Sequence, residues 1–96
     1  MLTFNLKKQW YEKIRSGEKT IEYREVKPYW TKRLELYGRE PDYLICKLTL
    51  GYAKNHMTAR ITKIEVVDGK DTDLAIDAPV YAIHLADVRE AGEYNR

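Results

Sequence analysis

The sequence has few of the residues that form cross-links, bind metals or cross membranes. It contains one cysteine, Cys46, so no internal disulfide can form, and its two histidines, His56 and His84, match no Cys/His spacing typical of a zinc site. No apolar run approaches the roughly 20 residues that span a bilayer, and residues 1–8 lack the long apolar stretch of a signal peptide. We therefore expect a cytoplasmic protein with a reduced thiol, no metal, no cofactor and no membrane partner.

The remaining composition is typical of a small globular domain. With 96 residues the chain can form a single domain, residues 1–96, around a thin core. An apolar share of 44% and a charged share of 33% favour a folded chain over a disordered one. Residues 87–96 are polar and are expected to form a flexible tail.

Charge and aromatic rings are unevenly distributed along the chain. Residues 1–39 carry ten Lys/Arg against five Asp/Glu and seven of the eleven aromatic residues, whereas residues 40–96 carry seven Lys/Arg against ten Asp/Glu. Basic charge interleaved with aromatic rings is typical of a nucleic-acid surface, where cations meet phosphates and flat rings meet bases. The plainer interpretation is a solvated helix face beside a core.

Periodicity predicts five short strands and two helices. Alternating apolar residues place the strands at residues 2–6, 20–24, 43–52, 58–67 and 80–85. Helical spacing predicts helices over residues 7–16 and 28–38. The apolar parity changes between Ile61 and Ile64, which indicates a bulge. This order predicts an α+β fold, a small mixed or closed sheet with the two helices on its outside.

The segment over residues 17–24 brings three charged residues to one turn and strand. Glu22 and Arg24 are two residues apart, so they project from the same strand face, and Lys19 lies at the strand mouth. A partly buried lysine near an arginine has a lowered pKa and can act as a base or nucleophile. Glu22 can serve as an acid/base group or accept a hydrogen bond from a base edge. The alternative is a surface cluster of ion pairs.

The same segment resembles the ASCH domain family of the PUA-like superfamily. Its Gly-x-Lys-x-x-Glu-x-Arg pattern stands at Gly17, Lys19, Glu22 and Arg24, and the flanking residues 6–11, 14–16, 48–52 and 58–61 also fit, so that the resemblance covers about residues 2–86. It implies a small PUA-like mixed β-barrel of about five strands, with the two helices on its outside and a cleft beside the first helix. Members of the family are linked to RNA binding, RNA-associated regulation and, in some branches, catalysis.

Two catalytic branches bear on this chain. One bacterial branch resembles it at Lys19 and hydrolyses the acetyl amide of N4-acetylcytidine with a lysine, a threonine and a glutamate; the place of the threonine falls on Glu22 here, and Glu65 is the candidate for the second acid. Another branch is described as a ribonuclease, and beyond the shared motif none of its residues is carried over.

Further residues are candidates for the binding site. Tyr29 and Trp30 follow the motif and are placed to stack a base, with Lys32 and Arg33 taking phosphates, although Trp30 also fits the core stripe of the second helix. Tyr52 follows an apolar strand and can point into the cleft.

Two other residues are expected in the core. Trp10 shares a helix face with Ile14, and Cys46 has the parity of a buried, unreactive thiol.

Three functions follow as hypotheses. The first is an RNA- or nucleotide-binding module in which Lys19 and Arg24 hold a phosphate or a base carbonyl and Glu22 reads a base amino group. The second is a small hydrolase of a modified nucleoside, or a ribonuclease, with Lys19 and Glu22 as catalytic groups. The third is an interaction module without a nucleotide ligand, in which Glu22 and Arg24 pair with each other.

Overall fold

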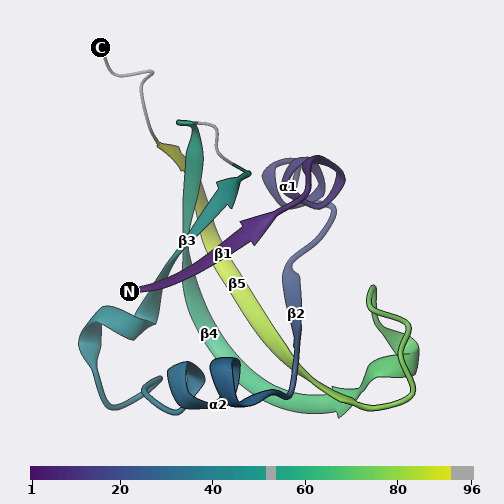
Figure 1. Ribbon diagram of the computed structural model, residues 1–96. Coiled ribbons are helices and arrows are strands. Elements are labelled where there is room, and N and C mark those ends of the chain that lie inside the picture. Colours follow the sequence, from purple (N-terminus) through teal and green to yellow (C-terminus); the bar gives the residue numbers. More distant parts are fainter. Residues whose placement is uncertain (52–53, 92–96) are drawn as a thin grey trace.

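The computed structural model describes residues 1–51 and 54–91, apart from the side chain of residue 42. This part of the chain forms an α+β fold with a curled five-stranded sheet and two α-helices, as the periodicity predicts (Figure 1). The elements in chain order are β1 (Leu2–Leu6), α1 (Lys8–Arg15), β2 (Ile21–Glu25), α2 (Pro28–Leu34), the 3-10 helix η1 (Pro41–Leu44), β3 (Ile45–Leu50), β4 (His56–Asp68), the 3-10 helix η2 (Gly69–Asp71) and β5 (Pro79–Ala91).

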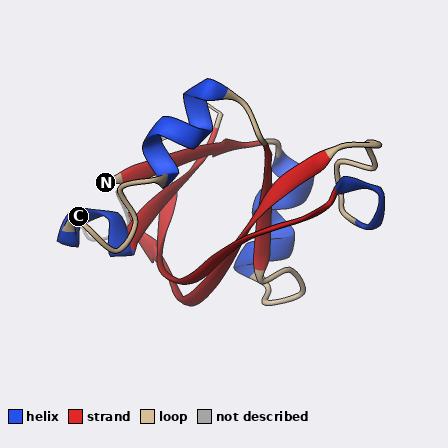
Figure 2. Cartoon of the chain, turned by 90° about the horizontal axis from the view of Figure 1, so that it is seen from below, coloured by secondary structure: helices blue, strands red, loops and turns tan. Residues whose placement is uncertain are grey.

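The sheet is a curled half-barrel whose two edges lie at β1 and β2. The strand order is β1-β3-β4-β5-β2, in which β1 runs parallel to β3 and the other neighbours are antiparallel. Figure 2 shows the strands curling around the interior. Because β1 and β2 stand at opposite ends of this order, no strand ladder joins them within the described chain. The barrel therefore has an opening along one side.

The core fills the concave face of the sheet. In β1 the alternating residues Leu2, Phe4 and Leu6 are buried, and α1 adds Tyr11 and Ile14. The other members of the core cluster are Leu34, Cys46, Leu48, Met57, Ala59, Ile61, Ile83 and Leu85. The expected burial of Cys46 is confirmed, and burial raises the pKa of its thiol to about 12.

Two local predictions have different outcomes. The expected bulge in β4 is confirmed, because its register with β5 shifts between Thr58 and Arg60 and again between Ile61 and Lys63. The tail expected from residue 87 is wrong for its first part, since β5 continues to Ala91. The physical reason is that β4 begins as early as His56, which pairs with Ala91. The start of β4 therefore provides backbone hydrogen-bonding partners for the end of β5. Residues 92–96 lie outside the described part. No helix among the described residues is long and apolar enough to span a membrane.

Candidate functional site

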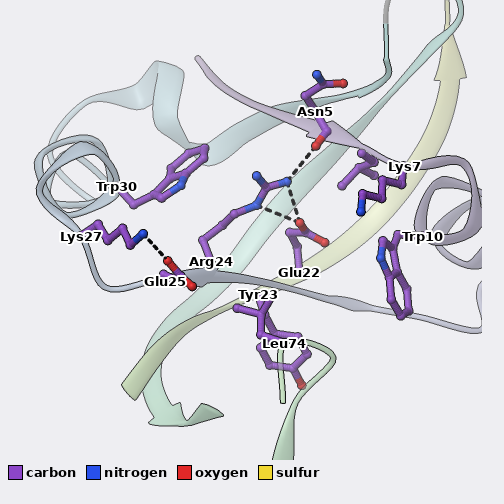
Figure 3. Close-up of a pocket in the computed structure, with 11 residues that line it drawn as sticks. Asn5, Lys7, Trp10, Glu22, Tyr23, Arg24, Glu25, Lys27, Trp30 and Leu74 are labelled. Carbon is purple, nitrogen blue, oxygen red and sulfur yellow. Dashed lines mark hydrogen bonds and ion pairs between the residues drawn. The ribbon is translucent and has the colours of Figure 1, made fainter. Parts of the chain in front are cut away.

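A cleft opens where the edge strands β1 and β2 face each other. Its main cavity has a volume of about 460 Å³, within the usual range of small-molecule sites. The end of β1, the start of α1, strand β2, the start of α2 and the loop before β5 all contribute to it (Figure 3). The lining residues are Asn5, Leu6, Lys7, Trp10, Glu22, Tyr23, Arg24, Glu25, Lys27, Trp30 and Leu74.

Glu22 lies on the floor of this cleft, on the inner face of β2. Its register partner on β5 is the fully buried Ile83, and Glu22 itself is only 6% exposed. Arg24, two residues along and therefore on the same face, donates from Nε to Glu22 Oε2 at 2.9 Å, and its Nη2 lies 2.7 Å from the same oxygen. A buried carboxylate needs such a partner, because an unpaired charge in the interior is strongly unfavourable.

Arg24 also connects the two edges of the half-barrel. Its Nη2 donates a hydrogen bond to the backbone oxygen of Asn5 on β1 at 3.1 Å. The guanidinium carbon lies 5.2 Å from the ring centre of Phe4 and 5.1 Å from that of Trp30, which are within cation–π range. Arg24 is thus held in a fixed position between β1, β2 and α2, and it remains 20% exposed towards the cleft.

Lys19 lies beside the cleft and is held by two acids and two rings. Its side chain is 10% exposed, its Nζ forms an ion pair with Asp73, and Glu22 Oε1 is 3.9 Å away. The same Nζ lies 4.8 Å from the ring centre of Tyr23 and 5.5 Å from that of Trp10. Lys19 lines two smaller cavities next to the main one, of about 300 and 40 Å³.

Burial and charge act in opposite directions on Glu22. Burial raises the pKa of its carboxyl above the ordinary value, while the positive charges of Arg24 and Lys19 oppose that rise and Asp73 adds to it. The net direction is upwards, so protonation of Glu22 is easier in the folded protein than in the unfolded chain. The pKa of Tyr23 is also raised, by burial first and then by the charges of Asp73 and Glu65.

The structure brings together four of the residues that the sequence singled out. Lys19, Glu22, Arg24 and Trp30 all line the main cavity or the smaller ones. Trp30 packs on the core residue Phe4, with ring centres 5.2 Å apart, and it also lines the cleft, while its stacking on a base stays a prediction.

The candidates on α2 lie apart from the cleft. Tyr29, Lys32 and Arg33 are not among the lining residues; Tyr29 is 56% exposed, and the Arg33 guanidinium covers its ring at 3.6 Å. Tyr52 lies outside the described residues.

Trp10 and Asp73 were not expected at the site. The prediction that Trp10 belongs to the core is wrong: α1 buries Tyr11 and Ile14, whereas Trp10 is only half-buried and lines the cleft. Figure 3 shows it across the cleft from Trp30. The position of Asp73 could not be predicted, because its contact with Lys19 joins residues 54 apart in the sequence and no local pattern encodes such a contact.

Glu65 does not take the place suggested for a second acid. Its carboxylate hydrogen-bonds His84 at 2.7 Å and lies 3.3 Å from Lys63 Nζ, and these contacts lower the pKa of Glu65. The acid that contacts Lys19 is Asp73. Within the described chain, no group of three or more His, Cys, Asp or Glu residues is arranged to hold a metal ion.

The site therefore combines flat rings, a hydrogen-bond acceptor and cations in one cleft. Comparison with protein families, with curated proteins and with solved structures found no match.

Proposed function

We propose that this chain is an ASCH-type, PUA-like domain that binds a nucleotide-sized ligand, in free form or as part of an RNA, in the cleft between β1 and β2. The observation that carries the proposal is a cavity of about 460 Å³ with the rings of Trp10 and Trp30 on its two sides and the Glu22–Arg24 pair between them (Figure 3). This combination suits a base, which has flat faces to stack and a polar edge to read.

Each lining group has a defined role in this proposal. The indole rings stack on the base, an interaction worth about 1–3 kcal/mol per base. Glu22 accepts from a base amino group, and Arg24 donates to a neighbouring base carbonyl or ring nitrogen. Lys7 and Lys27, at the mouth of the cleft, meet a phosphate.

Intrinsic fluorescence tests the proposal directly, because Trp10 and Trp30 are the two tryptophans of the sequence and both line the cleft. We expect nucleoside monophosphates or short RNA to change the emission in a saturable manner, with a Kd of about 1 mM or tighter at low ionic strength and weaker binding in salt.

Two neighbouring lysines provide a matched pair of variants for this titration. Lys7→Ala should weaken binding of the phosphorylated ligands more than of the nucleosides, whereas Lys8→Ala, outside the cavity lining, should leave both unchanged. If a panel of nucleosides, nucleotides and RNA oligomers leaves the emission unchanged at low ionic strength, the proposal is wrong.

A second candidate function rests on the surroundings of Lys19. Its amine lies between the carboxylates of Asp73 and Glu22, next to a cavity that joins the cleft at Trp10 and Tyr23. Such an arrangement suits a small amidohydrolase of a modified nucleoside. Lys19 activates a water molecule that adds to the acyl carbonyl, or attacks that carbonyl to form an acyl-lysine that water then hydrolyses, and Glu22 passes the proton to the departing amino nitrogen, so that the acid and the nucleoside are released.

Turnover of N4-acetylcytidine tests this second function. We expect the activity to be lost in Lys19→Ala and retained in Lys8→Ala, with the acetate released as the readout. The absence of turnover in the unmodified protein, or turnover that survives Lys19→Ala, would exclude it and leave the binding function in place.

A further inference from the structure

One edge of β4 lacks a strand partner over residues 62–68. Strand β3 pairs with β4 only from Thr49↔His56 to Ile45↔Arg60, whereas β4 continues to Asp68 along β5. Just before the free stretch, the Tyr37 hydroxyl donates to the backbone oxygen of Ile61 at 3.3 Å. Within the described residues, alternate backbone N–H and C=O groups of residues 62–68 therefore face outwards without a ladder.

This edge has the regular geometry that strand pairing requires. The last register shift of β4 falls between Ile61 and Lys63, and from Lys63 to Asp68 the pairing with β5 runs without a break. The stretch contains no proline, and Val66 exposes 59% of its surface. Two of the features by which natural sheets protect an open edge, a bulge and a proline, do not occur within residues 63–68.

The charges on this edge are self-complementary in one antiparallel register. With Ile64 of one copy opposite Ile64 of another, Lys63 lies opposite Glu65 of the second copy, and the same pair occurs again on the other side of the axis. An axis at Lys63 would place two lysines opposite each other, and an axis at Glu65 two glutamates, which is unfavourable. Both side chains are accessible, with Lys63 61% and Glu65 37% exposed.

We propose that two copies of this chain associate by antiparallel pairing of the β4 edges, with a twofold axis at Ile64. The pairing adds backbone hydrogen bonds to both sheets and places two Lys63–Glu65 contacts across the interface. None of residues 62–68 lines the cavities at the cleft, so the ligand site of each copy stays open. An interface this short belongs to the small class, so the dimer forms and dissociates with concentration.

Sedimentation velocity of the full chain over about 10–1,000 μM tests this association. We expect the average mass to rise with concentration from 11.4 kDa towards twice that value. Glu65→Lys and, independently, Lys63→Glu place like charges opposite each other and should each raise the dimer dissociation constant about tenfold.

The double variant with both substitutions restores the opposite charges and should restore the dimer. Circular dichroism identifies any variant that does not fold. If one of the two single variants, Glu65→Lys or Lys63→Glu, does not fold, the other is used for the comparison. A single mass of 11.4 kDa at every concentration would overturn the proposal, as would single variants that associate as well as the unmodified protein.

Discussion

The carboxylate of Glu22 occupies a position in the half-barrel where an apolar side chain would be the ordinary choice. Paired burial of this kind adds little net stability, because the cost of removing two charges from water is close to the gain from their attraction. Loss of one partner is different: without Arg24 the buried carboxylate would lose its hydrogen-bonded partner and keep only the more distant Lys19, 3.9 Å away, and breaking a buried pair in this way costs about 3–5 kcal/mol. An ion pair that adds little stability is consistent with a role in ligand binding.

The raised pKa of Glu22 gives a prediction about stability and pH. Since burial raises the folded pKa above the unfolded value, the contribution of Glu22 to stability is full below the unfolded pKa and falls as pH rises through the folded pKa. In Glu22→Gln this dependence is absent. We expect the free energy of unfolding of the unmodified protein, minus that of Glu22→Gln, to decrease as pH rises from 4.5.

Urea denaturation of both proteins across a pH series measures this difference. A difference that increases with pH would mean that the cations Arg24 and Lys19 outweigh burial, and the assigned direction would be wrong.

The sequence predicts the local geometry of these residues but not their environment. That Glu22 and Arg24 share a strand face follows from the period of two, which is a local property. That this face points inwards does not follow, because the opposite face carries Ile21 and Tyr23 and is equally suited to burial. Packing against β5, which is distant in sequence, determines which face of β2 is buried.

At the scale of elements, the loop between η2 and β5 supplies the part of the site that sequence patterns missed. Asp73 and Leu74 lie in this loop: Leu74 lines the main cavity (Figure 3), and Asp73 lines the two smaller ones. Gly69 fixes the base of the loop: its N–H donates to the Ala78 oxygen at 2.8 Å, and its own oxygen accepts from the Thr72 hydroxyl at 2.8 Å.

Gly69→Ala tests the role of this loop. An added Cβ would lie 2.5 Å from the backbone oxygen of Ala78 and 2.7 Å from that of Ile76, so the loop must shift. We expect a loss of about 1–3 kcal/mol in the free energy of unfolding, from overpacking, and weaker ligand binding because Asp73 moves away from Lys19.

The exposed neighbour Lys70 provides a control for this variant. Lys70→Ala should leave both the stability and the binding close to the unmodified values. Chemical denaturation and the fluorescence titration report the two effects separately, and a Gly69→Ala protein with unchanged stability would contradict the packing described here.

At the scale of the whole molecule, the cleft exists because the barrel is not closed. Five strands of this length form a curled sheet, and the side chain of Arg24 on β2 bridges its two edges through contacts with Asn5 and Phe4 on β1. The sequence predicted the number of strands and their order along the chain, since each strand has its own alternation of apolar and polar residues. It could not predict which strands become edges, because that depends on pairing between distant segments.

The same geometry bears on the third hypothesis, an interaction module without a nucleotide ligand. That function would gain support if the Glu22–Arg24 pair filled the opening. The ion pair is present, with Nη2 and Oε2 2.7 Å apart, yet a cavity of about 460 Å³ remains beside it. The room for a ligand favours the binding function.

Heteronuclear NMR of the labelled protein with nucleoside monophosphates tests the central claim most directly, because the sequence has two indole N–H groups, those of Trp10 and Trp30, and both rings line the cleft. We predict that both resonances shift together and reach saturation, along with the backbone resonances of Glu22 and Arg24. Ligands at saturating concentration that move neither indole resonance, or that move only resonances of the β4 edge, would contradict the assignment of the cleft as the binding site.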